Sequence, residues 1–312
     1  MRLSITIPVL NEEQVLPELL RRVGAVLDTI PGGPHEVVLV DDGSTDRTRA
    51  MLVEACAADP RVHAILLSRN FGHQAAITAG LDHVTGDLIV AMDGDLQDMP
   101  EDIPRFIAAQ AEGYDVVYAV RTLRKEGLLL RACYFVFYRL MTRFSRVKVP
   151  PDAGDFALIT RRVLTAMQSA PERNRYLRGL RAWAGFRQRA FPVERAERAG
   201  GHSKYSYRSL IKLALDGLFA FSTMPIRAAM LLGAGAVAAA ILYTLWAVFE
   251  RIFRPNSPAP PGFTATIVIV TFLSGMNLFF MGVIGEYVGR VYEEVKARPM
   301  YVVERVVGRR DT

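Results

Sequence analysis

The residues most able to do chemistry are two aspartates, Asp93 and Asp95, which stand one residue apart directly after an apolar run. Two carboxylates at one strand end can share a hard cation such as Mg²⁺ or Mn²⁺, which takes further ligands from substrate phosphates and water. Gln97 supplies another oxygen within reach of the same turn, and Gly94 lets a ligand approach the backbone. Short acidic turns are common in loops, so the place of this turn in the fold decides its meaning.

The elements that must position this turn alternate between strand and helix along the first part of the chain. Short apolar or β-branched runs predict strands, and the segments between them predict helices. Asn11 and Gln14 resemble a capping box ahead of the first helix. Such alternation favours a parallel sheet with helices on both faces. The predicted strands are residues 3–9, 36–40, 62–67, 87–92 and 114–120.

Polar side chains follow four of these strands, at Glu12, Asp42, Arg69 and Asp95. The carboxyl ends of parallel strands meet at one edge of a sheet, and ligands of such folds bind beyond that edge. The four groups are therefore expected to surround one site, which strengthens the acidic turn as a metal candidate. The sequence has no P-loop and no Gly-x-Gly-x-x-Gly after its first strand, so ATPase and NAD-dependent classes lack their signatures.

The C-terminal part of the chain differs in character. Residues 228–249 and 262–285 carry no charged side chain, and a helix of about 20 residues crosses a bilayer core. We expect a transmembrane hairpin over 226–290, since the alternative, buried core helices of a soluble domain, would need unusually long uncharged helices. Flanking basic residues favour both ends in the cytosol. The catalytic domain would then cover 1–225, and 291–312 would be a cytosolic tail.

Two more stretches, residues 128–148 and 203–222, have the pattern of amphipathic helices lying in the headgroup plane, with ordinary surface helices as the alternative. The hydrophobic fraction of 51% and the net charge of +6 agree with a membrane surface or a phosphorylated substrate. Nothing in the basic residues is typical of a nucleic-acid partner. Cys56 and Cys133 are too few for a disulfide framework. The chain opens without a signal-peptide pattern, which fits a cytosolic catalytic half.

Three motifs at the strand ends resemble the inverting glycosyltransferases of family 2, which adopt the Rossmann-like, nucleotide-sugar-binding A fold. These are residues 7–12 (IPVLNE), 40–46 (VDDGSTD) and 93–97 (DGDLQ). Four further motifs, 154–156 (GDF), 172–176 (ERNRY), 201–205 (GHSKY) and 285–290 (GEYVGR), narrow the resemblance to the polyprenyl-phosphate branch. Within that branch the chain is most similar to bacterial undecaprenyl-phosphate glucosyltransferases of O-antigen modification, and dolichyl-phosphate mannose synthase is related.

The resemblance implies a role for particular residues. Leu10 departs from the Tyr common there in mannose synthases, so the nucleotide base is not fixed. Cations are needed because donor diphosphate and acceptor phosphate bring several negative charges together. The implied nucleotide-sugar-binding residues are Pro8, Leu10, Glu12, Val40, Asp42, Asp93, Gly94 and Arg121. The implied metal ligands are Asp93, Asp95 and Gln97. The implied phosphate and acceptor residues are Arg131, Arg198, Ser203 and Lys204.

The implied catalytic residues are Asp155 and Asp95. A phosphate monoester with a second pKa of about 6 is already mostly dianionic at neutral pH, so it needs little help from a base. We therefore expect Asp155 to orient the acceptor phosphate, with a general base as the second reading. A simple turn cap after Gly154 is the structural alternative.

The expected activity is inverting transfer of a hexose, with UDP-glucose as the favoured donor, to undecaprenyl or another polyprenyl phosphate. The cofactor is Mg²⁺ or Mn²⁺, and the place is the cytoplasmic (inner) membrane with the catalytic domain facing the cytosol. The resemblance also implies a homo-oligomer, a tetramer, and a flippase and a downstream periplasmic glycosyltransferase as partners. The lipid-linked product would serve cell-envelope glycan modification.

Three alternatives stay open from sequence. The same reaction could use mannose, galactose, an N-acetylhexosamine or an aminoarabinose derivative. A processive polysaccharide synthase would share the A fold, but its Gln-x-x-Arg-Trp segment is absent around Trp183. A non-catalytic membrane scaffold would not need Asp93, Asp95 and Asp155 together.

Overall fold

The computed structural model describes residues 1–121, 153–170, 172, 175–193, 224–253 and 262–308. The helices predicted at 128–148 and 203–222 lie outside these residues. The described residues belong to two compact units: a sheet unit, with the residues up to 193 and again from 298, and a helical unit between them in sequence.

The sheet unit is built on one 8-stranded sheet in the order β7-β5-β6-β4-β1-β2-β3-β8. Its centre is parallel: β1 pairs with β2 and β4, and β2 pairs with β3. The strands are β1 (Leu3–Val9), β2 (Glu36–Asp41), β3 (Val62–Leu67), β4 (Leu88–Ala91), β5 (Val116–Arg121), β6 (Ala153–Thr160), β7 (Gln188–Val193) and β8 (Val303–Val307). All five predicted strands are present, within one or two residues at each end.

The five predicted strands all run in the same direction, but the sheet also holds two antiparallel strands, β6 and β8, that the sequence did not predict. β6 runs antiparallel to both β4 and β5, and β8 runs antiparallel to β3. Ala153 at the start of β6 pairs with Val120 near the end of β5. β6 therefore begins at the end of the sheet where β5 finishes, and a strand that starts there beside β5 must run the opposite way.

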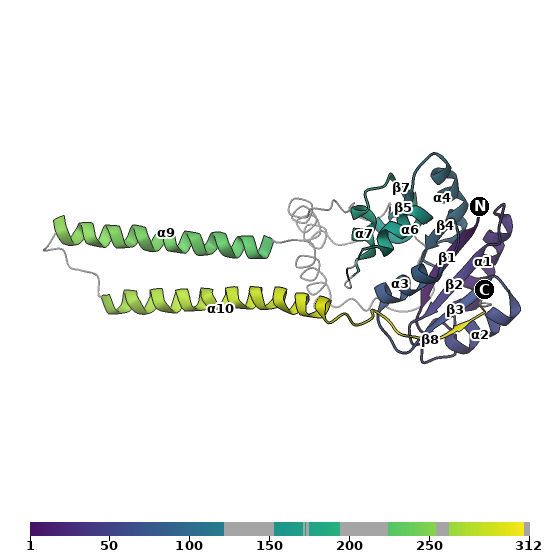
Figure 1. Cartoon of the computed structure of the whole chain (residues 1–312), viewed down its shortest axis with the longest axis horizontal. Helices are drawn as coiled ribbons and strands as arrows, with labels where there is room; N and C mark the ends of the chain where they lie inside the picture. Colours follow the sequence, from purple (N-terminus) through teal and green to yellow (C-terminus); the bar gives the residue numbers. More distant parts are fainter. Residues whose placement is uncertain (122–152, 171, 173–174, 194–223, 254–261, 309–312) are drawn as a thin grey trace. The chain divides into compact units, whose positions relative to one another are not determined.

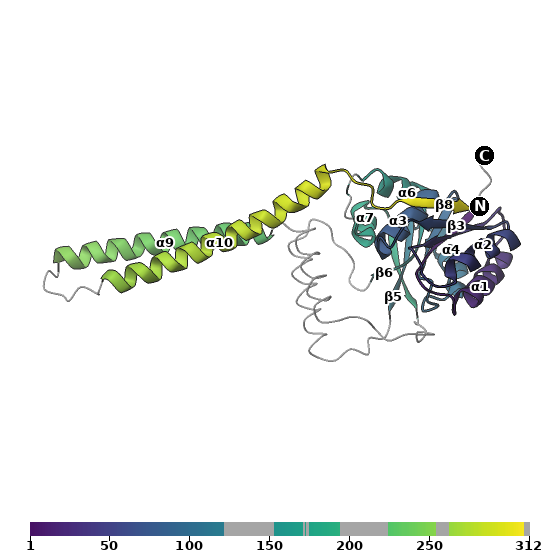
Figure 2. The same ribbon diagram turned by 90° about the horizontal axis from the view of Figure 1, so that it is seen from below.

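Helices cover both faces of the sheet and bury a separate apolar cluster on each (Figures 1 and 2). On one face lie α1 (Leu16–Thr29), α2 (Thr48–Ala58) and α4 (Ile103–Ala111), which follows the short 3₁₀ turn η1 (Pro100–Asp102). On the other lie α3 (His73–His83), α6 (Arg161–Gln168) and α7 (Leu177–Trp183). Phe106 of α4 is fully buried, with its ring centroid 4.8 Å from that of Phe156 on β6.

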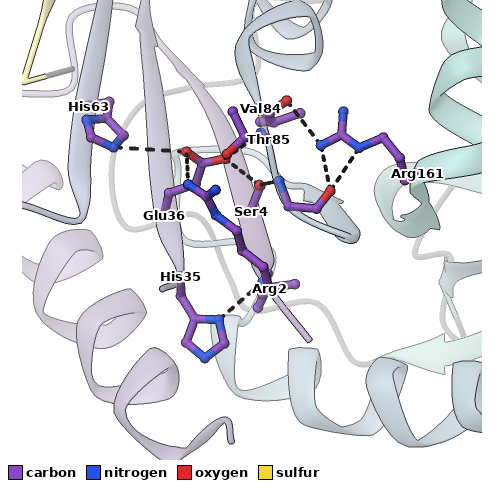
Figure 3. A network of polar contacts seen from close by, with 10 residues as sticks. Arg2, Ser4, His35, Glu36, His63, Val84, Thr85 and Arg161 are labelled. Atoms are coloured by element: carbon purple, nitrogen blue, oxygen red, sulfur yellow. Dashed lines mark hydrogen bonds and ion pairs between the residues drawn. The ribbon is translucent and has the colours of Figure 1, made fainter. Parts of the chain in front are cut away.

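A buried polar network closes the amino ends of the central strands (Figure 3). Glu36, at the start of β2, accepts hydrogen bonds from the Ser4 hydroxyl at 2.6 Å and from the Thr85 backbone N–H at 2.6 Å. Burial alone would raise the pKa of Glu36, but these hydrogen bonds lower it below its ordinary value. Arg161 donates to the carbonyls of Gly86 and Val84 beside it. Because the Glu36 carboxylate is held by the Ser4 hydroxyl and the Thr85 backbone N–H, we take this end of the sheet as structural and look for ligands at the opposite end.

The helical unit consists of α9 (Met224–Phe253) and α10 (Gly262–Val295), which pack along one another so that a Cβ at Gly233 would lie 3.7 Å from the Phe280 ring. Many of their apolar side chains are exposed, including Leu231, Leu278 and Val295. Among the described residues, one segment, Phe272–Val295, is long and apolar enough to cross a membrane, and Leu231–Trp246 is a shorter apolar stretch. The predicted pair of spanning helices at 228–249 and 262–285 therefore stays a prediction.

Candidate active site

The loops after β1 and β2 are tied together at the carboxyl edge of the sheet. The Asn11 backbone N–H donates to the Ser44 hydroxyl at 2.9 Å, and the Asn11 side-chain oxygen accepts from the Thr45 N–H at 2.8 Å. The predicted capping box is wrong, because the Asn11 side chain makes this contact with Thr45 and α1 begins only at Leu16. Asn11 takes a left-handed conformation, φ 55°, which asparagine tolerates better than most residues. The Asn-Glu and Asp-Gly-Ser-Thr motifs thus shape the rim of the site.

Asp42, at the end of β2, holds the loop that leads into α3. Its buried carboxylate accepts the backbone N–H groups of Phe71 at 2.7 Å and Gly72 at 3.0 Å. Burial raises the pKa of Asp42 even though these two hydrogen bonds oppose the shift. Gly72 adopts φ 98°, a conformation that favours glycine, and the next residue, His73, opens α3. Asp42 therefore sets the position of His73.

Replacing Asp42 by Ala is expected to lower the free energy of unfolding by about 1–3 kcal/mol, because two buried N–H groups lose their acceptor. Chemical denaturation of the full chain in detergent measures this loss. Asp46→Ala is the matched control, since the Asp46 carboxylate also accepts backbone N–H groups, from Glu13 and Thr48, in a more open position that water can reach. Equal losses in the two variants would contradict the role given to Asp42.

The acidic turn follows β4 as predicted and is held by its own carboxylates. Asp95 accepts the Gln97 backbone N–H at 3.1 Å, and Asp98 accepts the Asp93 N–H at 3.2 Å. Leu96 lies in the left-handed region, φ 58°, which is costly for a leucine and is typical of functional turns. A Cβ on Gly94 would meet the Pro8 carbonyl at 3.0 Å. Glycine is thus needed for close packing on β1, a reason that differs from the predicted approach of a ligand.

Four charged side chains from separate elements meet beside this turn. His73 Nε2 lies 3.4 Å from Asp93 Oδ1 and 3.8 Å from Asp155 Oδ2. Arg178 of α7 binds Asp155 of β6 with both arms of its guanidinium, Nε to Oδ1 and Nη2 to Oδ2, each at 2.7 Å. The structure therefore brings together two of the predicted carboxylates, Asp93 and Asp155, and adds a guanidinium and an imidazole as their partners.

His73 and Arg178 were missed by sequence reasoning. His73 comes six residues after the end of β3, within the segment that follows a strand at the ligand edge, and this position was the available signal. Arg178 follows the predicted motif at 172–176 by two residues. Its role depends on pairing with a residue far away in the sequence, for which the local pattern gives no sign.

Contacts within the cluster shift the pKa values of its members. Burial alone would raise the pKa of Asp155, but hydrogen bonds from Arg178 and His73 outweigh it and hold that pKa well below the usual range. For His73, burial lowers the pKa, while Asp155 and Asp93 raise it more, so the shift is upward. Arg181, almost fully buried behind the pair, donates to the Gly154 carbonyl at 3.2 Å, and burial lowers its pKa to about 10. Asp155 is thus an ionised, fixed carboxylate, which is a poor proton acceptor.

The remaining predicted nucleotide-binding residues lie around the same edge. Pro8 and Val40 are neighbours across β1 and β2, but the Val40 side chain is fully buried in the core, so only its backbone is near the edge. Leu10 is 39% exposed just beyond β1, and Glu12 is partly exposed beside it. Arg121 ends β5, opposite Val193 of β7. The predicted phosphate residues Arg131, Arg198, Ser203 and Lys204 lie outside the described residues.

The chemistry of the acidic turn suits a divalent metal. Asp93, Asp95 and Gln97 offer hard oxygen ligands on one turn, and a cation such as Mg²⁺ needs few protein carboxylates when substrate phosphates supply the rest. Within the described ranges no three His, Cys, Asp or Glu side chains form a ready-made metal cluster. The donor set therefore fits a metal that binds together with a phosphate-bearing ligand.

Fold and site together define an α/β enzyme with an acidic turn and paired cations at the carboxyl ends of its strands. Residues 4–167 match the family described as glycosyl transferase family 2, and the chain belongs to that family. This confirms the family resemblance of its motifs and makes the protein a glycosyltransferase.

Relatives match along nearly the whole chain. A Bacillus subtilis protein named an uncharacterized glycosyltransferase is 42% identical over 98% of this chain and 94% of its own length. The bactoprenol glucosyl transferase of Shigella phage SfX is 36% identical over 97% of this chain and 99% of its own. Among solved structures, a mannosyltransferase of Pyrobaculum calidifontis in complex with GDP-Man and Mn²⁺ is 19% identical, with a TM-score of 0.51 over 92% of this chain and 87% of its own. That structure shares the fold.

Proposed function

We propose that the protein transfers a hexose from a nucleotide sugar to a polyprenyl phosphate with inversion at the anomeric carbon. The observation that carries the proposal is the likeness, over almost all of both chains, to a protein named for glucosyl transfer to bactoprenol. The joined Asp93, His73, Asp155 and Arg178 cluster supports it, because two phosphate-bearing reactants need carboxylates for a metal and cations for phosphate in one place. Glucose from UDP-glucose is the favoured donor.

In the proposed reaction, an oxygen of the acceptor phosphate attacks the anomeric carbon, and the bond from that carbon to the nucleoside diphosphate breaks. The attacking phosphate is already mostly dianionic at neutral pH, and no proton has to be removed by the protein. Asp155, with both oxygens engaged, therefore serves to position neighbouring groups. Leu10, Glu12 and the loop that Asn11 ties to Ser44 and Thr45 would form the rim that receives the nucleoside.

Asp93, Asp95 and Gln97 would hold Mg²⁺ or Mn²⁺. When bound, the metal would offset the charge that develops on the departing diphosphate. The Asp95–Gln97 hydrogen bond would keep the carboxylate in place for this task.

The proposed acceptor is a lipid phosphate, so we expect the enzyme to act at a membrane. The apolar segments in α9 and α10 support anchoring of the chain, and the proposed topology is a two-helix hairpin at the cytoplasmic membrane with domain 1–225 and tail 291–312 in the cytosol. The proposed assembly is a homo-oligomer, a tetramer, and its product would pass to a flippase and a periplasmic glycosyltransferase.

The test is incubation of the purified full chain with labelled UDP-glucose, GDP-mannose or UDP-N-acetylglucosamine and undecaprenyl phosphate, with and without Mn²⁺. We expect one labelled, lipid-soluble product carrying a single sugar, formed only with metal and retaining the acceptor phosphate. A growing polymer would indicate a processive synthase. Absence of any lipid-linked product with every donor would refute the proposal.

A further inference from the structure

The Asp155 carboxylate is more deeply buried than its two partners, Arg178 and His73. The exposed fraction of its side chain is 10%, compared with 32% for Arg178 and 48% for His73. A ligand that enters from solvent therefore meets the side chains of Arg178 and His73 before it reaches the carboxylate. This order is the reverse of what a carboxylate acting directly on a substrate would show.

The two donors are also held close to each other. Besides their shared partner Asp155, the residues next to them are joined: the Leu177 backbone N–H donates to the Gln74 side-chain oxygen at 3.3 Å. This bond ties the start of α7 to the start of α3. Groups fixed in this way lose little freedom when a ligand binds, which favours tight and oriented binding.

The charges on the Arg178 side of the cluster suit an anion. The guanidinium groups of Arg178 and Arg181 stand against the single carboxylate of Asp155, and Arg181 is 5% exposed, with its Nε making no hydrogen bond to a described residue. A further carboxylate, Asp93, lies 3.4 Å from His73 and belongs to the turn proposed to hold the metal. A planar guanidinium fork matches the oxygens of a phosphate, and such charge-assisted bonds are among the strongest hydrogen bonds in proteins.

We propose that Arg178 and His73 form a phosphate-binding site, and that Asp155 holds these two side chains in place for it. The ligand class is a phosphate group, either the diphosphate of a nucleotide or the monophosphate of a prenyl lipid. Both reactants come from the proposed function, but the site itself is argued from burial and contacts and can be tested by binding alone.

The experiment measures dissociation constants of the full chain in detergent by isothermal calorimetry. The probes are UDP and GDP, each with Mn²⁺, and farnesyl phosphate. The variants are Arg178→Gln and Arg178→Lys. The matched control is Arg162→Gln, since Arg162 forms another two-armed pair with a buried aspartate, Asp115, directly before the start of β5.

We expect Arg178→Gln to raise the dissociation constant of at least one phosphate probe about 10-fold. Arg178→Lys should raise it less, because lysine keeps the charge but loses the planar fork of the guanidinium. If only the binding of farnesyl phosphate is weakened, the site binds the acceptor phosphate. If the binding of the nucleotides is weakened, the site binds the donor diphosphate. Arg162→Gln should leave the dissociation constants of all three probes within about twofold of the wild-type values, since the Arg162–Asp115 pair lies at the structural end of the sheet.

Unchanged dissociation constants in both Arg178 variants would overturn the inference, even if transfer were lost, because Arg178 would then only support Asp155. Equal weakening in the Arg162 variant would overturn it as well, since the effect would be a general loss of structure. If the wild type binds these probes but transfers no sugar to undecaprenyl phosphate, the proposed function fails while the site stands.

Discussion

Replacing Asp95 by Asn is expected to lower the rate of sugar transfer by about 10³-fold or more, because the proposed metal loses a charged ligand at the departing diphosphate. The fold should survive the change. An asparagine side-chain oxygen can still accept the Gln97 N–H that Asp95 accepts at 3.1 Å, so the turn keeps its shape. Initial rates at saturating donor over a range of Mn²⁺ concentrations measure the effect.

Glu101→Gln is the matched control for this variant. It removes one negative charge a short way along the same segment, from a side chain that pairs with Arg22 on the surface. Surface pairs of this kind contribute little, so the control should keep its rate and its dependence on metal. An Asp95→Asn enzyme with full activity at sub-millimolar metal would refute the assignment of the acidic turn.

Replacing Asp155 by Asn is the second change with a large expected effect, a loss of about 10³-fold in transfer, because both Arg178 and His73 lose their anchor. Asparagine fills the same space but presents one acceptor oxygen and no charge, so it cannot match the two-armed Arg178 contact. Steady-state kinetics at fixed pH measure the loss. If Asp155 were a general base, the wild-type rate would fall on the acid side of a pKa near neutrality, and we expect no such step from Asp155.

The same substitution has a signature in stability. The pKa of Asp155 is depressed on folding, so its contribution is complete above the ordinary aspartate pKa of about 3.9 and is lost as pH falls through the depressed value. His73 has the opposite sign: its raised pKa gives stability below about 6.5 that disappears as pH rises through the folded value. The difference in Tm between wild type and Asp155→Asn should therefore be largest between about pH 4 and 6.5 and should narrow below that window. A difference that grows as the pH falls below 4 would contradict the ionised state of Asp155.

Local patterns in the sequence were enough to predict the central strands and the acidic turn. The strand 62–67 coincides with β3, and Asp93 and Asp95 follow β4 as expected, because apolar runs and the turns that end them depend on neighbouring residues alone. The carboxyl edge of parallel strands then follows from topology, so the general location of the site was also within reach. The family followed from motifs that together span most of the chain.

Contacts between distant segments were beyond such patterns. Asn11 and Gln14 have the pattern of a capping box. In the structure, however, the Asn11 side chain accepts a hydrogen bond from Thr45, 34 positions away in the β2–α2 loop. The direction of β6 and the return of Val303–Val307 as β8 depend on where the chain re-enters the sheet, which no local pattern records.

The sequence by itself determined the kind of enzyme, the five central strands and the position of the two carboxylates of the acidic turn. Only the tertiary structure showed the partners of Asp155, since they lie on α3 and α7, which pack on the same face of the sheet. The sequence alone led us to expect that Asp155 orients the acceptor phosphate, with a general base as the second reading. Once Arg178 and His73 cover the Asp155 carboxylate, the cost of leaving a buried charge without partners makes it their anchor.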